Sequence, residues 1–169
     1  MNDSYVELLV KRKTNLAALI GRNILIGIGA LSILLMFVSN LGMIALLIAV
    51  AMGLAAYICN LEVNTEYEYL YLDKTFSVDK IRNQTSRKKM AEYKIEDMEV
   101  LAPATSHHLD AYNNRGDIKT IDYSSGQKEE PAYIMVIKHG NTVKKLIIEM
   151  NDELYKQIRM NSPRKVFND

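Results

Sequence analysis

The sequence lacks the residues on which many small proteins depend. It contains one cysteine, three prolines and no tryptophan. A single cysteine excludes an internal disulfide framework and a four-cysteine zinc site. The 21 Lys and Arg residues nearly balance the 20 Asp and Glu residues, which leaves a net charge of +1. We therefore expect no nucleic-acid partner, because such a partner calls for a clear excess of positive charge.

Charge is also missing from one long stretch. Residues 23–61 form a run of 39 residues without Asp, Glu, Lys or Arg. As one helix this run would extend roughly 58 Å, whereas the hydrocarbon core of a bilayer is about 30 Å thick. The run is too long for one span and suits two, so it predicts a transmembrane helical hairpin.

Polar residues near the middle and start of the run set the limits of the two spans. The adjacent pair Ser39-Asn40, followed by Gly42, is the natural break. The second span is then expected from about Leu41 to Asn60. The first needs to begin near Leu16 to reach about 20 residues. The chain is thus expected to hold an N-terminal segment 1–15, a hairpin 16–60 and a further domain 61–169.

The flanking charges predict the orientation. Basic residues precede the first span and follow the second, and the short connection between the spans has none. The positive-inside rule therefore predicts a two-span cell-membrane protein with both termini in the cytoplasm. A cleaved signal peptide is disfavoured because its apolar core is about 7 to 15 residues long and is not followed by a second span.

Small residues recur in both spans and let helix backbones approach one another. One interpretation is packing of the two spans within one chain, which we favour; the other is a ridge that joins copies of the chain into a homo-oligomer. The residues concerned are Gly27, Ala30, Ala45, Ala49 and Gly53.

The N-terminal segment 1–15 has the pattern of an amphipathic helix. Ser4 and Glu7 are spaced as a capping box, and Tyr5, Leu8, Leu9, Arg12 and Leu16 follow at helical spacing. Such a helix would lie on the inner membrane surface, either as an anchor that sets topology or as a lipid-sensing or partner-binding element. The basic side chains expected near the lipid headgroups are Lys11, Arg12, Lys13 and Arg22.

Beyond residue 61 the period changes to two, which is typical of strands with one apolar face. The first such strand runs from Val63 to Tyr71 with glutamates on its other face, and Asp73-Lys74 turns the chain into the next strand. Asn151 is placed to cap a final helix. Further strands are expected at 76–81, 90–95, 98–102, 118–123, 132–138 and 143–150, with loops at 103–117 and 124–131 and a turn at 139–142.

Several of these segments together carry a resemblance to a known family. They are the opening Tyr5 to Lys13, the two adjacent spans, the strand Glu66 to Tyr71, the strand Phe76 to Ile81 and the tract Arg87 to Lys89. The chain resembles an uncharacterised bacterial two-span membrane family, filed as a domain of unknown function, whose cytoplasmic part is similar to bacterial pleckstrin-homology-like domains.

The resemblance implies an α+β membrane protein. Its N-terminal transmembrane hairpin is followed by a mainly antiparallel, strongly bent β barrel with a C-terminal helix. It implies no activity, no cofactor and no catalytic residue. Phosphoinositide-binding members of the wider fold hold the headgroup in a basic loop between the first two strands. Here that link is taken to be the short Leu72 to Thr75, so inositol-lipid binding is not expected.

Residues with catalytic or ligating chemistry are few. His107, His108 and Asp110 form the one cluster of metal-ligand types, but adjacent histidines on an extended chain point in different directions, and a solvated loop is favoured. No nucleophile elbow or phosphate-binding loop is present. We therefore expect neither an enzyme nor a metal protein.

The densest basic tract of the second domain is Arg87, Lys88 and Lys89. On a strand, Arg87 and Lys89 share a face and Lys88 points to the other. The tract is interpreted as a charged strand edge that discourages aggregation, and alternatively as a contact with the inner leaflet of the membrane.

These features lead to two hypotheses of different class. The favoured one is a non-enzymatic, membrane-anchored interaction or scaffold module that presents a pleckstrin-homology-like domain at the cytoplasmic face to a protein partner. The alternative is a small accessory subunit or regulator of a membrane transport or secretion complex, in which the hairpin is the interface. Sequence alone does not identify the partner.

Overall fold

The computed structural model describes residues 5–38, 42–127 and 132–168. It divides into two compact units. The helical unit holds Lys13–Thr65 and Arg82–Ser86, and the sheet unit holds Met1–Arg12, Glu66–Ile81 and Arg87–Asp169. We describe each unit separately.

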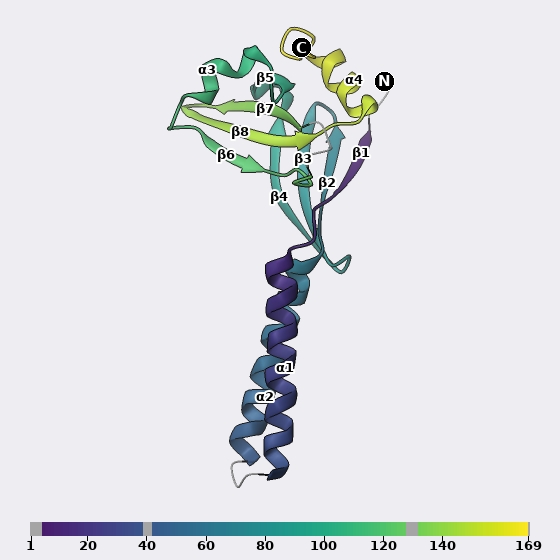
Figure 1. Cartoon of the computed structure of the whole chain (residues 1–169). Coiled ribbons are helices and arrows are strands. Elements are labelled where there is room, and N and C mark those ends of the chain that lie inside the picture. The colour runs from purple at the N-terminus through teal and green to yellow at the C-terminus, as the bar shows by residue number, and fades with distance from the viewer. Residues whose placement is uncertain (1–4, 39–41, 128–131, 169) are drawn as a thin grey trace. The chain divides into compact units, whose positions relative to one another are not determined.

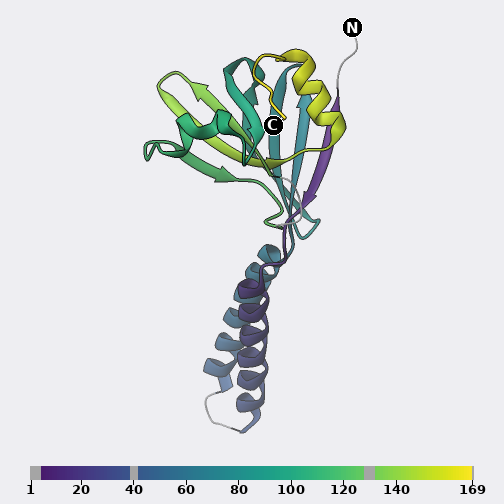
Figure 2. The ribbon, with the colours of Figure 1, turned by 45° about the horizontal axis from the view of Figure 1, so that its top comes forward.

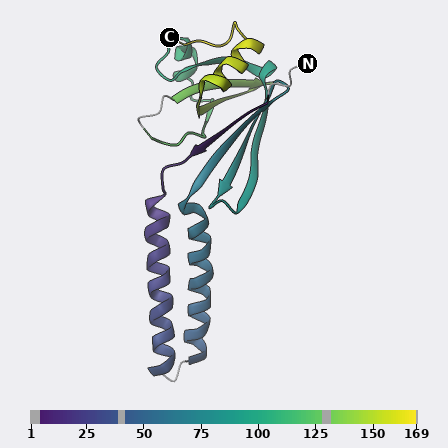
Figure 3. The ribbon, with the colours of Figure 1, turned by 90° about the vertical axis from the view of Figure 1, so that its right-hand side faces the viewer.

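Two helices, α1 (Leu16–Val38) and α2 (Gly42–Val63), lie side by side in the helical unit (Figure 3). Both are long and apolar enough to cross a membrane, and only 6% and 11% of their most apolar stretches are buried within the chain. Core helices of soluble proteins are mostly buried, so this exposure suggests a membrane protein with two spans. The predicted break at Ser39-Asn40 lies outside the described residues.

The first sheet has the order β1-β2-β3-β4. Its strands are β1 (Val6–Lys11), β2 (Thr65–Leu72), β3 (Thr75–Arg82) and β4 (Ser86–Lys94). The link between β2 and β3 is the predicted Asp73-Lys74 turn, whose φ angles of 47° and 59° are those of a tight hairpin turn. Val63, expected in the strand, instead ends α2.

The N-terminal amphipathic helix is not formed. Residues 6–11 are a strand whose Val6, Leu8 and Val10 pair with Tyr71, Tyr69 and Tyr67 of β2. Val6 and Val10 are buried in the main core, and Leu8 packs against it. Alternation of the apolar residues, and not their helical spacing, decides the structure here, because β2 offers a partner edge and a core to cover.

This strand changes the order of the fold. Because β1 precedes α1 and β2 follows α2, the helical hairpin is inserted between the first two strands of the sheet, as Figure 1 shows. The link of Leu72 to Thr75, taken from the sequence as the one between the first two strands, joins the second and third.

The second sheet has the order β5-β7-β8-β6. A short turn, η1 (Ile95–Asp97), leads into β5 (Met98–Pro103). The predicted hairpin is confirmed as β7 (Ala132–His139) and β8 (Thr142–Glu149), and β6 (Lys119–Asp122) runs parallel to β8. The predicted loop at 103–117 contains η2 (His107–Leu109) and α3 (Asp110–Asn113).

The two sheets share one core. Tyr69, Tyr71 and Phe76 of the first sheet meet Met135 and Leu146 of the second. The last helix, α4 (Asp152–Asn161), adds Leu154 and Ile158 to this core and lies beside β1 (Figure 2). Its predicted cap is confirmed, since the backbone N–H of Leu154 donates to the Asn151 side chain at 2.9 Å. The result is a pair of packed sheets with a C-terminal helix and not a closed barrel.

Candidate functional site

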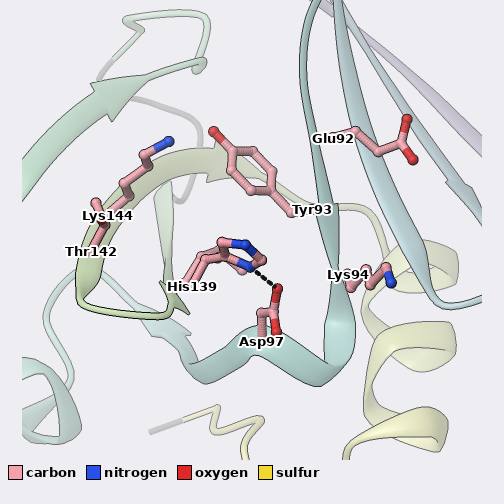
Figure 4. A pocket seen from close by; sticks show the side chains of 8 residues that line it. Glu92, Tyr93, Lys94, Asp97, His139, Thr142 and Lys144 are labelled. Carbon is pink, nitrogen blue, oxygen red and sulfur yellow. Dashed lines mark hydrogen bonds and ion pairs between the residues drawn. The ribbon is translucent and has the colours of Figure 1, made fainter.

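A cleft of about 360 Å³ opens between β4 and the β7–β8 hairpin. Its size falls in the range of small-molecule sites. Tyr93, His139 and Lys144 point into this space, whereas Glu92 and Lys94 point to the other side of β4 (Figure 4). The cleft belongs entirely to the sheet unit.

The floor of the cleft is apolar. Tyr93 is 9% exposed and Ile137 is 2% exposed, and both belong to the main core. β4 is the end strand of the first sheet, so its side toward the second sheet carries no strand partner. The cleft lies at this edge, next to residues of the main core.

The β7–β8 hairpin supplies the rim. Its turn contains Gly140 with a φ of +58°, a conformation that glycine adopts without strain. Chain reversal there puts His139 and Thr142 opposite one another in the ladder. Both therefore lie at the entrance of the cleft, above Ile137.

His139 is held in place by an acid. Its Nδ1 lies 2.9 Å from Asp97 Oδ2, and Asp97 comes from η1, between the two sheets. The His139 side chain is 87% exposed, so this contact fixes its position without burying it.

Lys144 is half-buried, and its ammonium group bonds to no other described residue. Two neighbouring lysines are engaged: the Lys145 ammonium donates to Asn113 at 2.7 Å, and Lys138 lies 3.4 Å from Glu99. Lys145 is also half-buried, but alternation puts it on the other face of β8. An ammonium group that points into the cleft without a bonded side chain is available to an anion there.

Buried tyrosines join the cleft to the core. Tyr123, next to β6, forms an edge contact with Tyr67, with ring centroids 5.4 Å apart. Burial, and after it a hydrogen bond to Tyr93, raises the pKa of the Tyr123 hydroxyl far above its ordinary value. The Tyr69 hydroxyl donates to the Tyr123 carbonyl at 2.7 Å. The wall behind the cleft is therefore neutral and hydrogen-bonded.

The tract Arg87, Lys88 and Lys89 lies on β4, the edge strand, as predicted. Two of its charges are already paired: Arg87 bonds to Glu68 and to Asp79, and Lys89 bonds to Glu92. Glu68 was expected on a polar outer face, yet it is buried at 6% exposure beneath the Arg87 side chain. None of the three residues lines the cleft.

The basic residues near α1 are separated by the fold. Lys11 ends β1, and Arg12 lies over the Tyr67 ring and donates to its hydroxyl at 3.2 Å. Lys13 is exposed in the segment before α1. Arg22, inside α1, donates to the Asn60 side chain of α2 at 3.0 Å and so links the two helices near their polar ends.

The small residues of the helices divide into two groups. Ala45 is buried and Ala49 half-buried against α1, whereas Gly27, Ala30 and Gly53 are exposed. The position in α1 that packs closely is Gly29, whose Cα faces Met52 and Ala49. The hairpin thus packs through Gly29, Ala45 and Ala49.

The His107, His108 and Asp110 cluster has no metal-site geometry. The His108 ring stacks on Phe167 with centroids 3.7 Å apart, and the His107 ring packs against His108 with centroids 4.1 Å apart. Among the described residues no group of three His, Cys, Asp or Glu side chains could hold a metal ion. These histidines pack the C-terminal segment.

Sequence reasoning missed every residue of the cleft as a site. Tyr93, Asp97, His139 and Lys144 come from four different elements, and no spacing rule connects them. The one available signal was Lys144 itself, a charge at an alternation position that otherwise carries the apolar Leu146 and Ile148.

A comparison with protein families gives one match. The family model described as Bacterial PH-like domain (DUF6106) matches residues 2–168. The match includes β1 and both helices, so the hairpin lies inside the matched region. A search of curated proteins finds no relative of this chain.

Proposed function

The chain belongs to the bacterial PH-like domain family, and on that premise we propose that it is a non-enzymatic, membrane-anchored binding module. The hairpin of α1 and α2 anchors it in the cell membrane, and the sheet unit binds a partner on the cytoplasmic side through the cleft between β4 and the β7–β8 hairpin.

The observation that carries this proposal is the insertion of the hairpin between β1 and β2. Four residues separate β1 from α1, and one residue separates α2 from β2. Two such short connections hold the sheet unit to the bilayer at two neighbouring strands. A domain joined by one long flexible linker can reach partners over a wide volume. Two short connections restrict the sheet unit more strongly, which suits a domain that binds its partner close to the membrane surface.

The cytoplasmic orientation rests on the charge distribution. Lys11, Arg12 and Lys13 precede α1, and the sheet unit carries most of the other basic residues. Reporter fusions at Asp169 test this orientation: cytoplasmic activity is expected, and a signal from the opposite side of the membrane contradicts it.

Binding is supported by the cleft. Tyr93, His139 and Lys144 point into it and can hold a ligand by hydrogen bonds. The insertion also affects lipid recognition, because the position between the first two strands is taken by the hairpin and not by a free basic loop. We therefore propose a partner other than an inositol-lipid headgroup, with contact to the bilayer made by Lys11 and Lys13.

Photocrosslinking in native membranes tests the module against the accessory-subunit alternative. A photoreactive residue at Thr142, on the rim of the cleft, is expected to give discrete adducts. One at Leu54, which is 63% exposed on α2, is expected to give lipid adducts only. Protein adducts at Leu54 with none at Thr142 would favour the accessory subunit. The outward position Leu54 is used because Ala45 and Ala49 face α1.

A further inference from the structure

We propose that the cleft between β4 and the β7–β8 hairpin binds a small organic anion, with a carboxylate bonded to Lys144 and an apolar body that covers the apolar part of the cleft lining beside the Tyr93 ring. This inference rests on the proposed function, since it specifies the ligand class of the same site.

The charge of the ligand follows from the pairing of the groups around it. The Asp97 carboxylate is hydrogen-bonded to His139 at 2.9 Å, and the Glu92 carboxylate is paired with Lys89 on the other side of β4. The Lys144 side chain is then the charged group that points into the cleft and bonds to no other described side chain. Three N–H donors of its ammonium are open to an acceptor, and a charge-assisted hydrogen bond to a carboxylate is the strongest contact they can make.

The lining of the cleft indicates the chemistry of the rest of the ligand. The accessible lining of the cleft is more apolar than polar, although Tyr93 and Ile137 are themselves only 9% and 2% exposed. An aromatic or short aliphatic group would cover this lining and gain from its burial, which a free inorganic anion would not. Thr142, at the entrance, adds a hydroxyl that can donate to a second oxygen of the carboxylate.

Size limits the choice. A cleft of about 360 Å³ lies near the lower end of the range of small-molecule sites. Ligands of this size typically bind small open sites with dissociation constants on the order of millimolar.

The chain offers a matched pair of variants. Lys144→Gln and Lys145→Gln remove the same charge at adjacent, half-buried positions of one strand, and only the first faces the cleft. Lys144→Arg keeps the charge. Comparable thermal unfolding of the three variants shows that each is folded.

The test uses the full chain in nanodiscs of zwitterionic lipid with two fluorinated probes, 4-fluorobenzoate and 4-fluorobenzamide, observed by ¹⁹F NMR. Benzoate is expected to bind saturably and about tenfold tighter than the uncharged benzamide. Lys144→Gln is expected to lose about that tenfold preference, Lys144→Arg to retain most of it, and Lys145→Gln to bind as the parent chain does.

Three results would overturn the inference: no saturable binding of benzoate by the parent chain, equal binding of the two probes, or equal losses in Lys144→Gln and Lys145→Gln. Failure here is distinct from failure of the binding module. Crosslinks from Thr142 to a protein partner would persist if only the ligand class were wrong.

Discussion

At the scale of single residues, the clearest test of the core is the Tyr69 hydroxyl. It is fully buried and donates to the Tyr123 carbonyl at 2.7 Å. Tyr69→Phe leaves this carbonyl without its partner, so the free energy of unfolding is expected to fall by about 1–3 kcal/mol. Urea denaturation measures the change. Tyr5→Phe, at an exposed position, is the control; equal losses in both variants would contradict the assignment.

The same tyrosines predict a loss of stability in alkali. Burial, the largest cause at both sites, raises the pKa values of Tyr69 and Tyr123 above the ordinary 10.0. Folding therefore favours the neutral phenols. Their contribution is complete below about pH 10 and is lost as the pH rises from there toward the folded-state pKa values. Denaturation midpoints should fall above about pH 10, and less steeply in Tyr69→Phe; a slope unchanged by that substitution would contradict the prediction.

At this scale the sequence anticipated packing better than binding. The alternation of Tyr67, Tyr69 and Tyr71 predicts their inward face, because burial of every second residue is a local property of a strand. The burial of Glu68 could not be foreseen, since it depends on Arg87 reaching across β3. The cleft is missed for the same reason: it exists only where β4 and β8 come together in space.

At the scale of elements, β1 is the decisive strand, and adjacent residues distinguish it from a membrane-surface helix. Val10 is 3% exposed and Leu9 is 53% exposed. Val10→Lys buries an unpaired ammonium group and is expected to destabilise the sheet unit by about 3 kcal/mol or more, whereas Leu9→Lys, opposite Glu68 in the ladder, is expected to cost less than about 1 kcal/mol. Proteolysis of the chain in nanodiscs would report both changes. A larger effect at Leu9 would favour the helix.

The N-terminal strand also shows why local patterns succeed for some elements and fail for others. The α4 helix and the β7–β8 hairpin were predicted because the Asn151 cap and the Gly140 turn lie within the elements that they define. The spacing of residues 5–16 fits a helix as well as a strand. The choice is made by β2, whose pairing residues stand more than fifty positions away, beyond the reach of any local rule.

At the scale of the whole molecule, the inserted hairpin separates two strands that are adjacent in the sheet by more than fifty residues of chain. A sheet whose first strand precedes two membrane helices cannot complete itself until both helices have been made. Residues 66–169 without β1 would leave Tyr67, Tyr69 and Tyr71 without the strand that pairs with them. The residues that form the sheet therefore lie on both sides of the helices.

A shortened chain tests this division. Lys11 and Glu66 face each other in the β1–β2 ladder, so an Asn-Gly pair in place of residues 12–65 would join them by a two-residue hairpin turn. This variant is expected to remain in the soluble fraction and to unfold cooperatively on heating. Residues 66–169 alone, as the control, are expected to aggregate or to unfold at lower temperature because the edge of β2 and the core beneath β1 are exposed.

Equal stability of the two chains would mean that β1 is dispensable. Membrane retention of the shortened chain would mean that the sheet unit carries an anchor of its own. If the shortened chain is soluble and unfolds cooperatively, the helical unit and the sheet unit are separable parts of one chain, and the cleft can be studied without a bilayer.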